Sequence, residues 1–460
     1  MKKKAALAMT LALGMTAVAG FGNGTANAEA TPQTYLVVFK QTTDLPSGYA
    51  SLIEQAGGTV TRAIPKLGAL EVVSSDADFL NAVQGSPLVQ EASVEHLVMP
   101  EESPVEGQVL DTDAMQPTEQ NWVYEQYGWD IKQVTDNGAS WNLPGGTGQS
   151  VDGKDIVIGI IDSGIDYNHP DIKPNYLYGK SFVPGITDPI DQMGHGTHIA
   201  GSIAAHGAML GIGPDLKLAS YRVFGPTGGA ATADIAAALM TAADDNVDVV
   251  NMSMGDYYWL QDPQYTTREL VADKNLLDRA IQYAINQGVT VVSSAGNAGA
   301  NLTNRHEMSG GEQGATQRIA GSQTMIRVAS NGEALNRAWY SNYGVGMIDV
   351  TAPGGDLGLA WLDENERGRP DFSKACTSTV PLLDRDHNVI GHGYAANLGT
   401  SMAAPKAAAL AGVIIAQHGK DVLTPAQVKH IIQSSTVDLN KPGYDAESGF
   451  GLINAVNALK

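Results

Sequence analysis

The stretch KDIVIGIID, residues 154–162, is an apolar run that ends in a carboxylate. Such a continuous run is typical of a strand that is buried on both faces of a parallel sheet. Four later stretches show the same pattern: LKLASYRVF (216–224), VDVVNMSMG (247–255), GVTVVSSAG (288–296) and MIDVTAPG (347–354). Segments with helical periodicity, such as LLDRAIQYAINQG, lie between them. This alternation predicts an α/β fold with a mostly parallel central sheet and helices on both faces.

Residues 1–28 carry the features of a secretory signal peptide. Lysines precede an apolar run, and the segment closes on the small-residue sequence Ala-Asn-Ala at 26–28. A membrane anchor is the alternative, but a Gly-Asn-Gly break after the apolar run argues against it. We therefore predict a secreted, extracellular protein with no membrane anchor.

Residues 29–99 have a different organisation. The strand-like run TYLVVFK (34–40) is followed by a helical stretch, two short strands, the helical SDADFLNAV and an apolar segment near Val94. This order predicts a small ferredoxin-like α+β module with the order β-α-β-β-α-β. Residues 100–121 are acidic and proline-rich without an apolar period, which predicts an exposed, cleavable linker.

The charge balance and the cysteine count exclude some classes of protein. The chain has 49 acidic and 28 basic residues, a formal net charge of −21. Such an acidic surface disfavours nucleic acid and anionic membranes as partners. A single cysteine, Cys376, allows no internal disulfide, so the fold must depend on its hydrophobic core.

Residues capable of chemistry lie where predicted strands end and predicted helices begin. In open parallel sheets, ligands bind beyond the carboxyl ends of the strands. Asp162 ends the first apolar run, Ser253 lies near the end of the third, and Asn297 follows the fourth. Ser401 starts the Ala-rich helical segment SMAAPKAAALAG, where the helix dipole favours negative charge. His195 lies between two glycines just before another predicted helix.

These residues also have purely structural interpretations. Ser401 could be a helix N-cap, with Pro405 in the first turn of the helix, and Asp162 could make an Asx turn. His195 and His198 could bind a metal, but HGTH lacks the glutamate and the i, i+4 spacing of the zinc motif. A serine hydroxyl is a weak nucleophile unless a base accepts its proton and a third group orients that base. The residues are therefore informative only as a set.

Three motifs together resemble those of the subtilisin-like serine peptidases. They are DSGIDYNHPD, GHGTHIAG and GTSMAAP, and they occur in the Asp, His, Ser order of that family. The resemblance implies that Ser401 is the nucleophile, that His195 is the general base and acid, and that Asp162 holds and stabilises the imidazole. His198 is then structural. Asn297, in SSAGNAG, matches the asparagine of the family's oxyanion hole.

The same resemblance implies two edges that bind substrate. NMSMG (251–255) is similar to the segment that lines the first specificity pocket, and GPTGG (225–229) to the edge opposite it. Both edges would bind an extended peptide by strand addition, although a simple Gly-rich turn is the alternative for the second. The candidate residues for peptide binding are Ser253, Met254, Gly255, Gly228 and Gly229.

The resemblance spans residues 122–460, and it also assigns the module that precedes them. That module resembles the inhibitor-type propeptide of the family. In family members this propeptide packs on the enzyme and leaves its C-terminal tail in the active-site cleft. The expected partners are therefore the chain's own propeptide and peptide or protein substrates, and we expect the mature protein to be a monomer. The polar stretch from Asp356 to Asn388 is longer than in the simplest members, which predicts a surface loop near the cleft.

No cofactor is required for the chemistry that the resemblance implies. Calcium would serve stability alone. The segment between Gly201 and Pro214 is shorter than the loop with which calcium-binding members of the family wrap their ion. This argues against their strong calcium site, although Asp171 retains an oxygen ligand.

These features predict a secreted serine endopeptidase that is made as a zymogen and processes itself. Lys406 and the stretch SYRVFGPTGGA resemble the lantibiotic leader-processing branch, so a dedicated leader-peptide peptidase is the alternative. A lipase of the α/β-hydrolase type is disfavoured, because GTSMA at 399–403 is not the G-x-S-x-G motif. An inactive peptide-binding scaffold would have lost a triad residue or the oxyanion asparagine, and neither is lost here.

Overall fold

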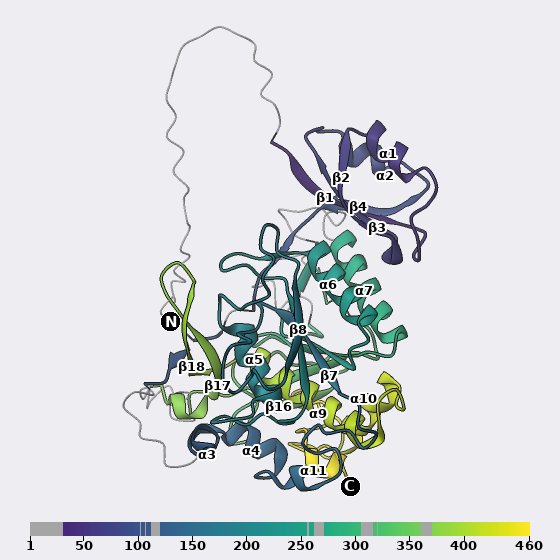
Figure 1. Cartoon of the computed structure of the whole chain (residues 1–460). Coiled ribbons are helices and arrows are strands. Elements are labelled where there is room, and N and C mark those ends of the chain that lie inside the picture. The colour runs from purple at the N-terminus through teal and green to yellow at the C-terminus, as the bar shows by residue number, and fades with distance from the viewer. Residues whose placement is uncertain are drawn as a thin grey trace, which may run out of the picture.

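The computed structural model describes residues 31–101, 103–105, 107–111, 120–254, 257–261, 271–304, 316–319, 321–358, 361 and 370–460. The predicted signal peptide and Gly255 lie outside the described residues. A small N-terminal unit packs against a larger α/β unit (Figure 1). No helix within these ranges has the length and apolarity needed to cross a membrane.

The centre of the larger unit is a sheet made of β7 (Val157–Asp162), β8 (Tyr176–Ser181), β9 (Lys217–Arg222), β11 (Val249–Met252), β13 (Thr290–Ser294), β15 (Ile326–Asn331) and β16 (Val350–Pro353). The strand order is β16-β15-β13-β11-β7-β9-β8, and all neighbouring pairs are parallel. The predicted fold class is confirmed. The chain runs from β7 to β9 on one side and later returns to β11 on the other. This reversal opens a crevice at the carboxyl end of β7.

The main helices that cover the sheet are α5 (His195–Ala204), α6 (Thr232–Asp244), α7 (Val271–Asn286) and α9 (Thr400–His418). One hydrophobic cluster joins α5 and α9 to one face, and a second cluster joins α6 and α7 to the other. All residues of α9 from Thr400 to Ala416 are buried. Its many alanines allow this helix to approach the sheet and α5 closely, so its N-terminal end is held in one place.

The remaining elements of the larger unit lie around this core. They are α3 (Trp122–Tyr127), α4 (Trp129–Thr135), α10 (Pro425–Ser434), α11 (Ala455–Ala458), β10 (Ala230–Ala231), β12 (Tyr257–Gln261), β14 (Thr316–Ile319), β17 (Cys376–Leu383) and β18 (Val389–Asn397). The loop predicted for residues 356–388 is partly wrong, because β17 pairs with β18 in a long antiparallel hairpin. The inner half of β17 is buried, since α5 packs against it.

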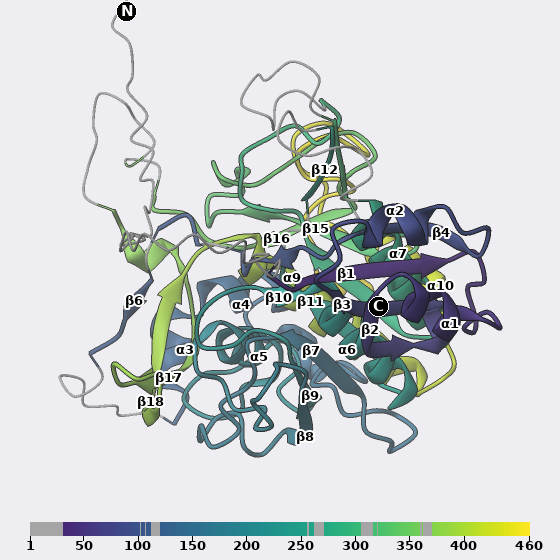
Figure 2. The ribbon, with the colours of Figure 1, turned by 90° about the horizontal axis from the view of Figure 1, so that it is seen from above.

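The N-terminal unit consists of β1 (Gln33–Phe39), α1 (Tyr49–Gln55), β2 (Gly58–Ile64), β3 (Ala69–Ser74), α2 (Phe79–Gln84) and β4 (Val89–Val94). This is the predicted order, and the strands form one antiparallel sheet in the order β2-β3-β1-β4. The sheet packs on α6 and α7 (Figures 1 and 2), and residues such as Leu36 and Val38 belong to the same cluster as those helices. Apolar burial therefore joins the two units.

Charged side chains add specific contacts to this interface. Arg62 pairs with Asp234 at the start of α6, and Lys66 Nζ lies 2.7 Å from Asp244 at its end. Arg279, on α7, donates to the carbonyl oxygens of Phe39 at 2.6 Å and Leu67 at 2.7 Å. These bonds fix the orientation of the small sheet on the two helices.

The segment after the small unit differs from the exposed linker that the sequence predicts. β5 (Leu97–Val98) pairs antiparallel with β10, and β6 (Gln108–Val109) pairs antiparallel with β18. The chain between these pairs passes the carboxyl end of the central sheet. Polar composition suggested a solvated segment, but main-chain pairing with two strand edges does not depend on side-chain polarity.

A buried ion pair lies under the N-terminal half of α9. Lys406 Nζ is 2.8 Å from Asp130 Oδ2 of α4, and both side chains are fully buried. Burial alone would lower the pKa of Lys406, but the charge of Asp130 raises it, so the lysine stays charged. A charge buried without its partner is strongly destabilising, so each of the two residues requires the other.

We expect Lys406→Met to destabilise the protein by about 3–5 kcal/mol, because it leaves Asp130 buried without a cation. Lys406→Met combined with Asp130→Leu should recover a large part of this loss, because no charge then remains buried. Urea unfolding in a Ser401→Ala background measures both values. As the matched control, Lys154→Met removes an exposed lysine that faces Asp152 and should change stability by less than about 1 kcal/mol. Equal losses for the two lysine variants would mean that the buried pair contributes no more than an exposed one.

Candidate active site

Asp162 and His195 meet at the crevice where the strand order reverses. Asp162 ends β7 and is fully buried, and His195 is the first residue of α5. His195 Nδ1 lies 2.8 Å from Oδ1 and 3.0 Å from Oδ2 of Asp162. A carboxylate in this position makes Nδ1 the protonated nitrogen and leaves Nε2 as the basic one.

Asp191, which no sequence motif indicated, organises the start of α5. Its carboxylate accepts hydrogen bonds from the main-chain N–H groups of Gly194 and Thr197 at 2.8 and 2.9 Å. Ser163, the residue after Asp162, also donates to it, at 2.9 Å. One fully buried carboxylate thus ties the end of β7 to the start of the helix that carries His195. The only sequence signal is an Asp shortly before the helix.

Ser401 lies in the first turn of α9 but does not cap it. The N-cap is Gly399 and no side chain caps this helix, so the N-cap interpretation of Ser401 is wrong. Pro405 is also further along than predicted, in the second turn. Because Pro405 has no N–H to donate to the carbonyl four residues earlier, the Ser401 carbonyl oxygen instead accepts from Ser253 Oγ at 2.9 Å. Asn251 Nδ2 donates in turn to Ser253 Oγ at 2.9 Å.

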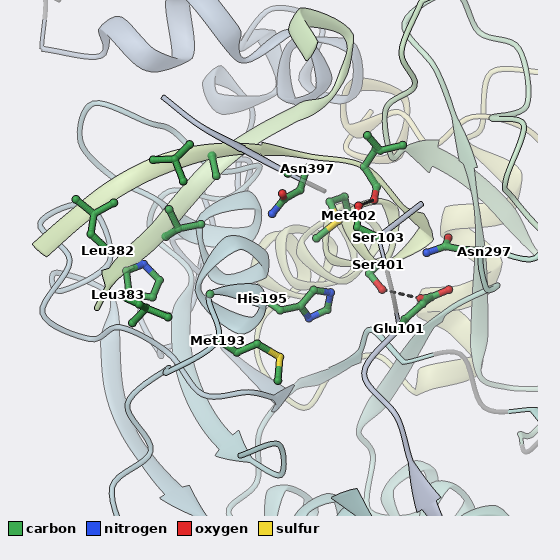
Figure 3. Close-up of a pocket in the computed structure, with 17 residues that line it drawn as sticks. Glu101, Ser103, Met193, His195, Asn297, Leu382, Leu383, Asn397, Ser401 and Met402 are labelled. Atoms are coloured by element: carbon green, nitrogen blue, oxygen red, sulfur yellow. Dashed lines mark hydrogen bonds between the residues drawn. The ribbon is translucent and has the colours of Figure 1, made fainter. Parts of the chain in front are cut away.

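The Ser401 hydroxyl faces a carboxylate that the sequence motifs did not indicate. Ser401 Oγ donates to Oε2 of Glu101 at 2.6 Å, and Glu101 lines the same cavity as His195 and Asn297 (Figure 3). Within the described residues, His195 Nε2 has no hydrogen-bond partner. The structure therefore brings His195 and Ser401 to one cavity, with the serine proton directed to Glu101.

Asn297 lies beside Ser401 and Glu101 in the cavity (Figure 3). Its Oδ1 accepts from the main-chain N–H and the hydroxyl of Thr400, both at 2.9 Å. Because the oxygen is held in this way, the amide orientation is set and Nδ2 is the donor end. Gly399 is needed close by, since a Cβ there would lie 3.1 Å from Nδ2 in a backbone with φ +149°.

The surroundings of His195 shift the pKa of its imidazole upward. Burial by itself lowers the pKa of this imidazole, but the charge and hydrogen bond of Asp162 raise it more, and Glu101 and Asp191 add to the rise. The result is a raised pKa. Removing Glu101 from the cavity takes away one of the contributions that raise the pKa of His195.

The described residues of the two predicted peptide-binding edges are not among those that line the cavity. Residues 97–98 of the chain itself pair with Ala230 and Ala231, directly after the predicted Gly228 and Gly229. A Cβ on Gly229 would lie 2.7 Å from the Val98 carbonyl oxygen, so this close approach needs glycine. On the other edge, Ser253 and Met254 have buried side chains, and Ser253 supports Ser401 as described above. Gly255 lies outside the described residues.

Two further predicted residues have structural contacts. His198 is fully buried, its Nε2 lies 3.1 Å from the carbonyl oxygens of Cys376 and Ala395, and burial lowers its pKa to about 3. Asp171 accepts from the N–H of Met209 at 2.8 Å and from the hydroxyl of Tyr394 at 2.9 Å. Both contacts are hydrogen bonds that the carboxylate accepts, and the expectation about calcium at Asp171 stays a prediction. The described residues contain no group of three or more His, Cys, Asp or Glu side chains suited to a metal.

Comparison with known proteins agrees with this geometry. The sequence profile of the subtilase family matches residues 153–451. Subtilisin E of Bacillus subtilis (strain 168) is 28% identical over 461 residues, 98% of each chain. Subtilisin J of Geobacillus stearothermophilus is 32% identical over 310 residues, 66% of each chain. The minor extracellular protease Vpr of Bacillus subtilis (strain 168) is 39% identical over 160 residues, 32% of this chain and 18% of Vpr.

Solved structures show the same fold. The epidermin leader peptide processing serine protease EpiP of Staphylococcus aureus has a TM-score of 0.73 at 23% identity, covering 94% of this chain and 98% of EpiP. The nisin leader peptidase NisP of Lactococcus lactis has a TM-score of 0.59 at 26% identity, covering 74% and 94%. The chain belongs to the subtilase family and is a subtilisin-like serine endopeptidase that acts on peptide or protein substrates.

Proposed function

We propose that this protein is a secreted endopeptidase zymogen in which Asp162, His195 and Ser401 form the catalytic triad. The observation that carries this proposal is the pair of bonds between His195 Nδ1 and Asp162, in a cavity that also contains Ser401. Secretion is supported by the signal-like residues 1–28 and by extracellular relatives such as Vpr.

The proposed chemistry follows from these positions. Ser401 Oγ attacks the substrate carbonyl carbon while His195 Nε2 takes its proton, and Asp162 stabilises the imidazolium that forms. The oxyanion receives hydrogen bonds from Asn297 Nδ2 and from the Ser401 N–H, which belongs to the first helical turn and so lacks a partner inside the helix. His195 then protonates the leaving amine, and water hydrolyses the acyl-enzyme.

The zymogen part of the proposal is supported by the course of the chain. Residues 97–109 run along the cavity between β10 and β18, and Glu101 receives the nucleophile's hydrogen bond. A protein substrate cannot occupy the same edges at the same time. The small unit on α6 and α7 would hold this segment in place until the chain is cut.

Removal of a leader peptide from another protein is the second candidate function. EpiP and NisP are both described as leader-peptide proteases, and a lanthipeptide protease structure is 29% identical with a TM-score of 0.59. A dedicated enzyme would cut one leader sequence far faster than casein. A general endopeptidase would cut both at similar rates.

A fluorophosphonate should label the mature protein on Ser401 in a one-to-one ratio, because a triad activates only this hydroxyl. Mass spectrometry of the labelled protein identifies the residue. Ser401→Ala should remain unlabelled and should accumulate as the unprocessed precursor. A folded mature protein that takes no label would exclude the serine peptidase mechanism.

Asn297→Leu should lower kcat by about 10²–10³ and change KM little, because its amide would bind only the oxyanion of the transition state. Steady-state hydrolysis of a chromogenic peptide measures both constants. Asn304→Leu, at a nearby surface position outside the cavity, serves as the control. A raised KM with an unchanged kcat would mean that the amide binds substrate and transition state equally.

The affinity of the cleaved propeptide should fall as pH rises. Glu95 Oε1 accepts from the Ala233 N–H at the start of α6, and burial raises the pKa of Glu95 to about 8. Asp234 beside it is shifted in the same direction, to about 6. The bound propeptide therefore favours the protonated form of both acids. Their contribution to its affinity is lost as pH rises from the ordinary carboxyl pKa to about pH 8.

The inhibition constant of added residues 29–101 against the mature enzyme should rise about tenfold or more from pH 6 to pH 8. Glu95→Gln should show a much smaller rise, because glutamine does not titrate. Glu54→Gln, at an exposed position of α1, is the matched control and should behave as the unmodified propeptide. A pH dependence that survives Glu95→Gln in full would assign the effect to other groups.

A further inference from the structure

Glu101 is held by three hydroxyl groups and by no lysine or arginine of the residues that the structure describes. Its Oε2 accepts from Ser401 Oγ at 2.6 Å and from Ser294 Oγ at 2.8 Å, and its Oε1 accepts from Thr400 Oγ1 at 3.0 Å. Ser294 and Thr400 are themselves buried. No lysine or arginine of the described chain forms an ion pair with this carboxyl group. Burial raises the pKa of Glu101, while the three hydrogen bonds oppose the rise.

The chain on both sides of Glu101 is arranged as a substrate would be. Before it, Val98 pairs with Ala230 in an extended strand. After it, Ser103 Oγ donates to the Leu398 carbonyl oxygen at 2.9 Å, and β6 then pairs with β18. The residue whose side chain lies at the nucleophile is therefore Glu101, with a strand pair before it at 97–98 and another after it at 108–109.

The position of the Glu101 side chain indicates which neighbouring bond is cut. Ser294 ends β13 three residues before Asn297, so the side chain of Glu101 occupies a pocket directly next to the proposed oxyanion donor. In acyl transfer, the residue that supplies the carbonyl is the one beside the oxyanion donors. Glu101 is therefore the residue next to the nucleophile, through its side-chain carboxyl group, and residue 102 lies outside the described residues.

We propose that the zymogen cuts itself after Glu101, and that Ser294 and Thr400 make the primary specificity pocket of the enzyme select glutamate. This inference rests on the proposed function, since it names the specificity of that same site. An apolar side chain in this pocket would leave buried hydroxyls without partners. Pockets built to bond a polar group reject analogues that lack it, because unpaired buried groups are costly.

The cleavage step balances as an ordinary hydrolysis. The Ser401 proton turns from the Glu101 carboxyl group to His195 Nε2, and Oγ forms an ester with the Glu101 carbonyl carbon. The bond to the nitrogen of residue 102 breaks, and His195 delivers the proton to that nitrogen. Water then cleaves the ester, which releases a new carboxylate on Glu101 and restores Ser401. The side chain keeps Ser294 and Thr400 as partners throughout.

The first test is the mature N-terminus of the full-length protein, measured by mass spectrometry. We expect it to be residue 102, and we expect Ser401→Ala to remain intact. Glu101→Gln keeps the shape and an acceptor oxygen, so it should be cut at the same bond within about tenfold of the normal rate. Glu101→Leu should be cut at least tenfold more slowly than Glu101→Gln. A mature N-terminus elsewhere, or equal rates for the two variants, would overturn the proposal.

The second test uses the mature enzyme and two peptides that read VMPE and VMPL before the bond, with identical residues after it. We expect kcat/KM to favour the glutamate peptide by at least about tenfold. Ser294→Ala should reduce this ratio severalfold, whereas Ser293→Ala, at the neighbouring serine whose hydroxyl faces the Ser294 carbonyl oxygen, should leave it unchanged.

The two tests separate this inference from the proposed function. An enzyme that takes the fluorophosphonate label and digests casein, but cuts VMPL as fast as VMPE, overturns the glutamate pocket and leaves the endopeptidase intact. A folded protein without label and without hydrolysis overturns both. Loss of the ratio in Ser294→Ala together with an unchanged ratio in Ser293→Ala supports the pocket, because a general disturbance of β13 would affect both variants.

Discussion

The complete burial of α9 is the constraint on which the active site depends. This helix is enclosed from Thr400 to Ala416 by the sheet and by α5, so its N-terminal turn cannot shift without disturbing the core. The ion pair of Lys406 with Asp130 fixes it further along its length. Its first turn therefore lies at one place, beside the ends of β7, β11 and β13. The nucleophile, the base and the amide are brought together by the packing of apolar surfaces distant from the chemistry.

A second feature of the site is that side chains bond the main-chain N–H and carbonyl groups that the helices leave unpaired. Pro405 removes a helical N–H, and the carbonyl of Ser401 is bonded by Ser253 instead. Asp191 satisfies the first N–H groups of α5 and bonds Ser163 at the end of β7. Each bond joins one helix terminus to one strand terminus. The carboxyl ends of the strands and the amino ends of the helices are held as one rigid edge.

The small N-terminal unit places an acidic segment in an acidic site. Glu101 lies near Asp162 and Asp191, and all three contribute to the raised pKa of His195. Glu95 and Asp234 face each other across the interface with raised pKa values. Because neighbouring carboxylates repel each other, the two units associate most strongly when some of these carboxyl groups are protonated. Association of the two units therefore depends on proton uptake by these carboxyl groups as well as on apolar contact.

The sequence by itself determined the fold class, and its resemblance to the family motifs supplied the three residues of the proposed triad. The apolar runs, their order, and the spacing of three motifs were sufficient, because buried strands and helix starts depend on local pattern. β8 and β15 were missed: the first is an exposed edge strand, and the second is interrupted by Arg327 and ends in the polar pair Ser330 and Asn331. Only the tertiary structure placed Glu101 at Ser401 and Asp191 at the start of α5, and only it showed residues 97–98 paired with β10 and 108–109 paired with β18. These contacts join residues up to 300 positions apart through main-chain edges and hydroxyl groups, which leave no periodic pattern in a sequence.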